Sequence, residues 1–169
     1  MKIFLIFLLM SFSCHLWAQS CLSSITNTSP DTNFTDNGDG TVIDSTTGLM
    51  WMKCSIGQTF DAINNTCTGE ATVMTWQEAL QSTYAFEFAD LTSWRLPNVK
   101  ELASITERSC VRPAINATFF PSTPPDDFWT STPSLVDLNS SWVVAFFNSS
   151  NALKDKNNFV FVRLVRFAE

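Results

Sequence analysis

The cysteines constrain the fold of this 169-residue chain more than any other residue type. Four of the five, Cys21, Cys54, Cys67 and Cys110, follow an apolar N-terminal segment that contains Cys14. An even number of cysteines in an exported chain predicts two disulfides. We expect Cys54 to pair with Cys67 across a short polar loop, and Cys21 to pair with Cys110 by elimination. No Cys-x-x-Cys pair is present, which argues against a thioredoxin-like redox site and a zinc ribbon.

Residues 1–18 have the pattern of a secretory signal. Lys2 is followed by an apolar run at residues 3–10, and Ala18 ends a segment suited to cleavage before Gln19. The apolar run is too short to cross a bilayer, and no later segment approaches about 20 apolar residues. We therefore expect an exported protein that is periplasmic, cell-surface or secreted. The alternative is a lipoprotein acylated at Cys21, but Gln19 fits poorly to the cleavage site that such a lipoprotein needs before its cysteine.

Removal of the predicted signal also removes Lys2 and His15, the single histidine of the chain. Without histidine, a Ser-His-Asp or Cys-His mechanism is excluded, and the commonest transition-metal ligand is missing. The remaining chain has nine lysines and arginines and sixteen aspartates and glutamates, which gives a net charge of −7. This acidic balance argues against binding to nucleic acid or to an anionic membrane. We expect no metal and no cofactor.

The predicted mature chain begins with an extended polar lead-in at residues 19–33, and a single domain occupies residues 34–169. Turn residues at 36–40 and 45–48 alternate with short β-like runs, which predicts an N-terminal β-hairpin or meander. The aspartates at 36–40 also suggest calcium. An EF-hand loop with Gly40 at its sixth position would place Thr35 first and Thr46 twelfth, so that pattern fails.

Two segments carry helix-start signals. Thr75 and Glu78 have the spacing of a capping box, which predicts a helix over about 75–86. Asn98 and Glu101 have the same spacing before an apolar stripe, which predicts a second helix that ends near Glu107.

The C-terminal half predicts an ordered loop followed by two strands. Prolines at 113, 121, 124, 125 and 133 exclude a long helix, and residues 128–131 form a short β candidate within that loop region. Residues 141–147 and 159–165 are apolar at alternate and intervening positions alike. Strands of this kind are central ones covered on both faces.

Seven short motifs in this order resemble one known family. They are DNGDGTV at 36–42, TGLMW at 47–51, TWQEA at 75–79, WRLPNVKEL at 94–102, PAIN at 113–116, FWTST at 128–132 and VRLVR at 162–166. The set resembles the Lcl C-terminal domain family, named for the collagen-like Legionella adhesin, over about residues 33–167. The resemblance implies an α+β, C-type-lectin-like fold: two helices flanking a small antiparallel sheet, an N-terminal β-hairpin, a long loop region and two disulfides.

The resemblance also implies adhesion, because a relative of this family is an adhesin module that binds sulfated polysaccharide through basic residues. This chain departs from that pattern in its net charge of −7 and in lacking a collagen-like stalk. The Glu-Pro-Asn and Trp-Asn-Asp calcium motifs of sugar-binding C-type lectins are absent as well. Any ligand is therefore expected to bind without calcium, in the loop region at residues 112–140.

The candidate ligand-binding residues are aromatic and acidic side chains in or beside that region: Asp126, Asp127, Phe128, Trp129 and Trp142. An indole face suits the apolar face of a sugar, although core packing is the competing interpretation for both tryptophans. Asp126 and Asp127 could serve as a glycosidase acid pair. Such a pair must face across a cleft several ångströms wide, and adjacent residues usually do not.

Other residues are expected to hold the fold: Trp94, Arg95, Pro97, Glu101 and Arg163. Trp94 is expected in the core, and Arg95 is expected to pair with Asp90 or Glu101, because a buried guanidinium needs a carboxylate or carbonyls. Arg163 and Arg166 interrupt an apolar strand on opposite faces. We expect one of them to form an ion pair and the other to be exposed.

The sequence therefore predicts a non-enzymatic binding module of a bacterial envelope or the extracellular space, which recognises a glycan or a protein surface. The alternative is a structural component of a surface assembly without a small ligand, and a glycan hydrolase is the third hypothesis. No nucleic acid partner and no transmembrane segment are expected. The oligomeric state does not follow from the sequence.

Overall fold

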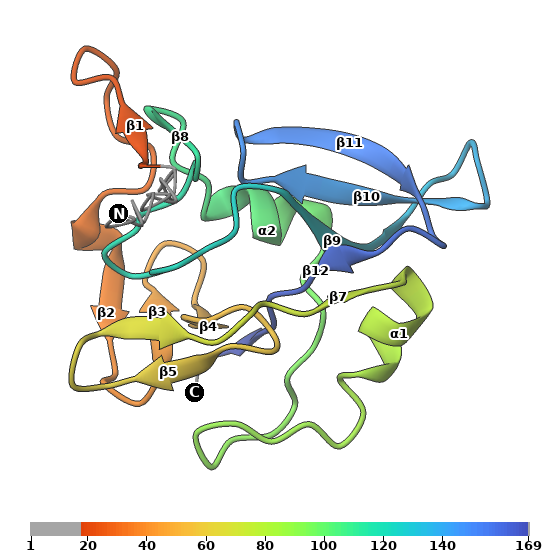
Figure 1. Ribbon diagram of the computed structural model, residues 1–169, viewed down its shortest axis with the longest axis horizontal. Helices are drawn as coiled ribbons and strands as arrows, with labels where there is room; N and C mark the ends of the chain where they lie inside the picture. The colour runs from red at the N-terminus through yellow and green to blue at the C-terminus, as the bar shows by residue number, and fades with distance from the viewer. Residues whose placement is uncertain (1–17, 169) are drawn as a thin grey trace, which may run out of the picture.

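The structure, a computed structural model, describes residues 18–168 and consists mainly of β-strands (Figure 1). Thirteen strands form four sheets within those residues, together with two α-helices of six residues each. The predicted α+β, C-type-lectin-like arrangement, with two helices flanking a small sheet, is therefore wrong. The predicted signal segment lies outside the described residues, apart from Ala18. None of the helices at 18–168 has the length and apolar character needed to cross a membrane.

A four-stranded antiparallel sheet has the order β13-β4-β3-β2. Its strands are β2 (Phe34–Asp36), β3 (Thr41–Asp44), β4 (Leu49–Met52) and β13 (Val165–Phe167). The first three form the meander that the turn residues predict. The side chain of Asp39 closes the first turn by accepting a hydrogen bond from the Thr41 backbone N–H at 2.9 Å. Asp44 closes the second turn in the same way, through the Thr46 N–H at 2.9 Å.

A five-stranded sheet has the order β11-β10-β9-β12-β7. Its strands are β7 (Val73–Met74), β9 (Asp127–Pro133), β10 (Ser140–Ala145), β11 (Ser150–Asp155) and β12 (Val160–Phe161). Side chains alternate across it: Trp129 and Val143 belong to one core cluster, and Phe128 and Val144 to the other. The central part of the sheet is thus buried on both faces, as the continuous apolar run of residues 141–147 predicts.

The single strand predicted at 159–165 is wrong, because β12 and β13 divide this segment between two sheets. Arg163 lies at the crossing and is fully buried. Its Nη1 donates to the carbonyl oxygens of Met52, at 2.8 Å, and Lys53. Both acceptors of this Nη1 group are neutral carbonyls, and Arg166 is buried too, so neither arginine is the exposed cation expected.

The helices α1 (Trp76–Gln81) and α2 (Val99–Ser104) begin where predicted and end early. Both capping boxes are present, with Thr75 and Asn98 as the caps. Hydroxyl side chains donate hydrogen bonds to backbone carbonyls at the helix ends. Ser82 donates to the Ala79 carbonyl at 2.9 Å, and Ser104 donates to the Glu101 carbonyl at 2.7 Å. Hydroxyl side chains that compete for backbone groups favour helix termini, which accounts for the shorter helices.

The small elements complete the fold. β1 (Ser20–Cys21) pairs with β8 (Cys110–Val111), β5 (Thr59–Asp61) pairs with β6 (Thr66–Thr68), and a short 3-10 helix spans Asp31–Asn33. The two disulfides are Cys21–Cys110 and Cys54–Cys67, the pairs expected from the sequence.

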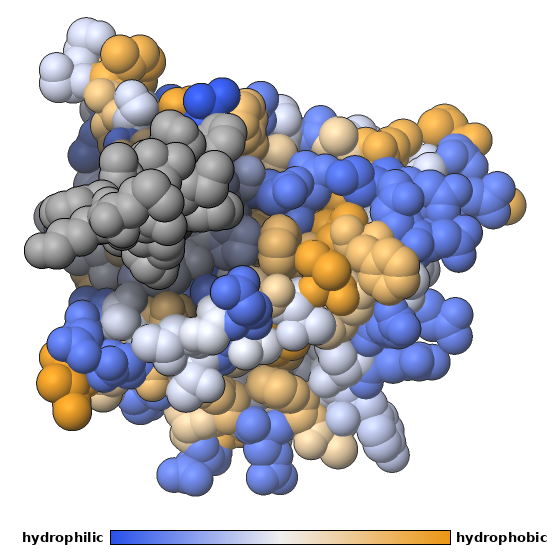
Figure 2. Space-filling view, viewed as in Figure 1, coloured by the Kyte–Doolittle hydropathy of each residue, from blue (hydrophilic) through white to orange (hydrophobic). Residues whose placement is uncertain are grey.

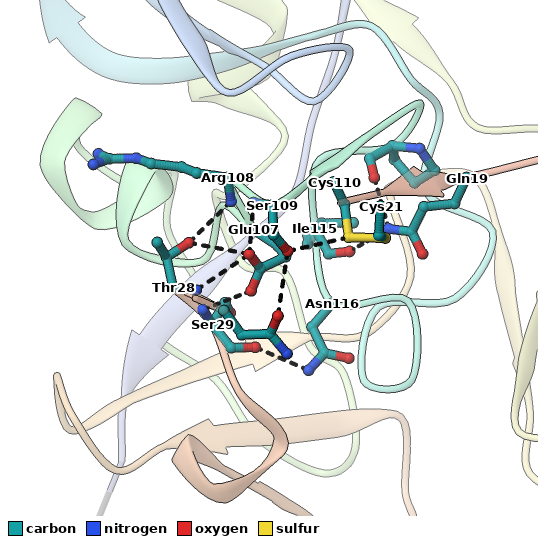
Figure 3. The surroundings of a disulfide bond; sticks show 12 residues. Gln19, Cys21, Thr28, Ser29, Glu107, Arg108, Ser109, Cys110, Ile115 and Asn116 are labelled. Carbon is teal, nitrogen blue, oxygen red and sulfur yellow. Dashed lines mark hydrogen bonds between the residues drawn. A yellow bond between two sulfur atoms is a disulfide. The ribbon is translucent and has the colours of Figure 1, made fainter. Parts of the chain in front are cut away.

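The lead-in is tied to the domain by Glu107, next to the Cys21–Cys110 disulfide (Figure 3). The buried Glu107 carboxylate accepts hydrogen bonds from the backbone N–H groups of Thr28 at 3.2 Å, Ser29 at 2.8 Å and Ser109 at 2.8 Å. A disulfide and a carboxylate together therefore hold residues 20–29 against the segment after α2.

The structure shows which contacts the residues expected to hold the fold make. Trp94 is 2% exposed, and its indole N–H donates to the carbonyl of Leu91 at 3.1 Å. Arg95 pairs with Glu101 through two hydrogen bonds of 2.8 Å each, and both side chains remain partly exposed. Pro97 is buried, and its carbonyl accepts from the Ser131 N–H at 2.8 Å.

Candidate ligand-binding site

A hollow of about 600 Å³ lies between the segment after β8 and the end of β10. Its volume falls within the range typical of ligand pockets. We call it the Arg112–Phe147 hollow, after the two residues at its mouth. It is lined by Arg112, Pro113, Ala117, Phe120, Ser122, Thr123, Pro125 and Phe147.

Backbone hydrogen bonds hold its two walls together. The Arg112 N–H donates to the Phe147 carbonyl at 3.2 Å, and the Ala114 N–H donates to the Phe146 carbonyl at 2.6 Å. The Arg112 backbone has φ of +56°, which non-glycine residues adopt rarely. Its guanidinium lies 4.6 Å from the centroid of the Phe147 ring, a cation–π contact. The mouth therefore combines a positive charge with an aromatic ring.

The floor of the hollow is built on a buried cation. Thr123 Oγ1 donates to the Phe120 carbonyl at 2.8 Å and accepts from Arg163 Nη2 at 2.7 Å. The Arg163 guanidinium lies 5.0 Å from the Phe120 ring centroid. Burial lowers the pKa of Arg163 to about 9, so the side chain stays charged at neutral pH. The hollow thus has an apolar floor with positive charge behind it.

The rim is attached to the loop that the Cys54–Cys67 disulfide closes. Gln58 Nε2 donates to the Ser122 carbonyl at 3.2 Å, and the hydroxyls of Ser122 and Thr66 lie 3.2 Å apart. This disulfide loop therefore supports one side of the hollow.

Phe128 and Trp129, two of the predicted ligand residues, lie in the core, which corrects that expectation. Both side chains are fully buried. The Trp129 indole N–H donates to the Met74 carbonyl at 2.8 Å, and the Phe128 ring packs edge-on against Phe146 at 4.9 Å. Since neither ring reaches the surface, neither can stack on a ligand in this structure.

The other three predicted residues lie outside the Arg112–Phe147 hollow. Asp126 is exposed, and Asp127 forms an ion pair with Lys154; both line a separate hollow of about 210 Å³. The two residues are adjacent in the chain, and the Asp126 carboxylate accepts a hydrogen bond from the backbone N–H of Asp127 at 2.7 Å. Trp142 is half-buried, opposite Leu153 of β11. Ligand contact by these three residues stays a prediction.

None of the eight lining residues was predicted from the sequence as a ligand-binding side chain. Seven of the eight lining residues fall within residues 112–140, where the ligand was expected, but the aromatic wall comes from Phe147 beyond it. The available signals were an arginine at the start of the proline-rich segment and a phenylalanine at the end of an apolar strand.

The chemistry of the lining is simple. It contains five apolar residues, two hydroxyls and one guanidinium, with no carboxylate, thiol or imidazole. Within residues 18–168, no three His, Cys, Asp or Glu side chains are grouped in a way that could hold a metal ion. The arrangement can bind an apolar group, and it can bind an anion beside that group.

A comparison with protein-family models gives a match over most of the chain. The family model described as the Lcl C-terminal domain matches residues 40–166, which include every lining residue of the Arg112–Phe147 hollow. No curated protein matches the chain. Because the family model covers well over half of the sequence, the chain belongs to the Lcl C-terminal domain family.

Proposed function

We propose that this protein is an exported, adhesin-like binding module of the cell envelope or extracellular space, without catalytic activity, and that the Arg112–Phe147 hollow is its recognition site. The observation that carries the proposal is the lining, an apolar concave surface with a guanidinium at its mouth. Recognition sites are commonly apolar hollows in which few polar groups fix the orientation of the ligand.

The lining supports binding over glycan hydrolysis. Hydrolysis of a glycosidic bond ordinarily requires two carboxyl groups on opposite sides of the scissile bond. The hollow supplies none, and the pair predicted from the sequence, Asp126 and Asp127, lies elsewhere with Asp127 bound to Lys154.

Export is supported by the two disulfides. Disulfides persist in oxidising compartments and are rare where thiols are kept reduced. The Cys21–Cys110 bond joins residues 89 apart, so it holds the lead-in and the domain together only in such a compartment.

Between the two partner classes, the lining favours a protein segment over a glycan. A sugar buried here would leave hydroxyl groups against Pro113, Ala117 and Pro125, which cannot hydrogen-bond through their side chains. An aliphatic or aromatic side chain fits these walls, and a neighbouring carboxylate can face Arg112. The acidic net charge also opposes a polyanionic glycan.

The test uses the chain from residue 19 onward in two parallel screens, a displayed peptide library and a glycan array. We expect selected peptides to carry an apolar side chain next to Asp or Glu. Their binding should be lost in Ala117→Glu, which places a carboxylate in the hollow, and retained in Ala62→Glu, a matched change at an exposed turn. Binders that do not distinguish the two variants would show that the site is elsewhere, and binding to glycans alone would contradict the partner class.

A further inference from the structure

The loop between β9 and β10 presents apolar side chains to solvent. We call residues 134–139 the β9–β10 tip; it lies at the right of Figure 1, where Figure 2 shows hydrophobic side chains at the edge of the molecule. Leu135 is 93% exposed, Val136 90% and Leu138 82%. Single exposed apolar residues are ordinary, but three in one short loop indicate an interaction surface.

Hydrogen bonds give the β9–β10 tip a defined shape. Ser134 Oγ accepts from the backbone N–H groups of Val136 at 3.2 Å and Asp137 at 3.0 Å. The Asp137 carboxylate accepts from the Ser140 hydroxyl at 2.6 Å, and Lys156 Nζ donates to the Leu138 carbonyl at 2.7 Å. Because the loop is already ordered, less conformational entropy is lost when it docks.

The β9–β10 tip and the Arg112–Phe147 hollow are complementary in shape and charge. The tip projects from the edge of the molecule (Figure 1) and is apolar, with Asp137 between two aliphatic residues in the sequence. The hollow is concave and apolar, with the guanidinium of Arg112 at its mouth. The hydrogen bond from Ser140 lowers the pKa of Asp137, so its carboxylate is charged at neutral pH.

The two surfaces lie at opposite ends of β10, which begins directly after the tip and ends two residues before Phe147. Six residues of strand place them roughly 20 Å apart. A tip therefore cannot fill the hollow of its own chain, whereas it can reach the hollow of another.

We propose that the β9–β10 tip of one copy docks into the Arg112–Phe147 hollow of a second copy, with Asp137 facing Arg112, so that copies associate head to tail. This inference rests on the recognition site proposed above. A contact between two different surfaces of the same chain is heterologous, and it produces a ring or an open filament according to whether the rotation closes. One loop tip buries little area compared with a stable dimer, so association is weak and depends on concentration.

The first experiment is sedimentation velocity over a range of concentrations. We expect the weight-average mass of the wild-type chain to rise with concentration. Leu135→Asp, at the tip, and Ala117→Glu, in the hollow, should remain monomeric. Ile63→Asp and Ala62→Glu are the matched controls, because Ile63 is 94% exposed and both residues lie on the β5–β6 loop; these should associate like wild type.

A mixing experiment tests the head-to-tail geometry itself. Leu135→Asp retains an intact hollow, and Ala117→Glu retains an intact tip. An equimolar mixture should therefore form dimers and nothing larger, because only one productive contact remains between the two variants. If the interface were symmetric, both variants would carry the same defect, and the mixture would not form dimers.

Three results would overturn the proposal: a wild-type chain that stays monomeric throughout, tip and hollow variants that associate like wild type, or a mixture that does not dimerise. Binding of monomers to phosphatidylcholine vesicles, lost in Leu135→Asp, would assign the tip to a lipid surface instead. If self-association fails while selected peptides still distinguish Ala117→Glu from Ala62→Glu, the recognition site stands and only the second-copy partner is refuted.

Discussion

Replacing Glu107 by alanine removes the acceptor that joins the lead-in to the domain. Its carboxylate receives backbone N–H groups from Thr28, Ser29 and Ser109, as Figure 3 shows. Thr28 lies at the surface, where water can replace the lost acceptor, whereas Ser29 and Ser109 are buried. A buried donor left without a partner costs about 1–3 kcal/mol. Two such donors lower the free energy of unfolding by about 2–6 kcal/mol.

Urea denaturation followed by tryptophan fluorescence measures this change, with the free energy extrapolated linearly to water. Glu87→Ala is the matched control, since Glu87 is exposed, and its effect should stay within about 0.5 kcal/mol. A loss below about 1 kcal/mol for Glu107→Ala would refute the assignment of the carboxylate as a buried acceptor.

The pH dependence provides an independent check. Burial by itself would raise the pKa of Glu107, but hydrogen bonds from Ser109, Ser29 and Thr28 outweigh it and lower the pKa below the ordinary 4.5. A lowered pKa in the folded state means that the stabilisation is present above pH 4.5 and is lost as the pH falls through the folded value. The difference between wild type and Glu107→Ala should therefore shrink on acidification. A stability difference that grew on acidification would contradict the lowered pKa of Glu107.

Three further substitutions test the framework. Trp94→Ala should lower the free energy of unfolding by about 3–5 kcal/mol, because it truncates a buried indole; an unchanged melting temperature would contradict that. Arg95→Ala should cost only about 1 kcal/mol, because its pair with Glu101 is partly exposed, and a double-mutant cycle measures the pair. Removing Cys21–Cys110 should cost about 4–5 kcal/mol and removing Cys54–Cys67 about 3 kcal/mol, because the entropy of closing a loop rises with the logarithm of its length. The reverse order in thermal unfolding would count against the loop-entropy argument.

The features that the sequence predicts well depend on neighbouring residues. The caps at Thr75 and Asn98 and the turns at Asp39 and Asp44 use side chains within three residues of the backbone groups they satisfy. Each of these structures forms by the same chemistry wherever the segment lies in the fold, so local spacing is sufficient to predict it.

The features that the sequence does not predict depend on distant pairing. Phe128 and Trp129 lie on opposite faces of one strand, and both are buried because β9 and β10 form the middle of a sheet covered on both sides. The run at 159–165 has the local pattern of one strand. What divides it is the burial of Arg163, whose acceptors at Met52 and Lys53 are more than a hundred residues away in the sequence. No local pattern indicates either arrangement.

The candidate site also depends on contacts between segments that are distant in the sequence. Arg112 and Phe147 meet because a backbone hydrogen bond joins segments 35 residues apart, and the buried charge of Arg163 reaches the floor through Thr123 from a third segment. The proline-rich composition indicates an ordered loop, but it does not indicate which side chains border the hollow.

The central claim, that the Arg112–Phe147 hollow is the recognition site, is tested most directly by chemical-shift mapping. The ¹⁵N-labelled chain from residue 19 onward is titrated with the tightest peptide from the display selection. We expect the largest backbone amide shifts within residues 112–125 and at Phe147, with the same peptide causing no shifts in labelled Ala117→Glu. Shifts concentrated instead around Trp76 and Lys156, which line a different hollow, would contradict the account.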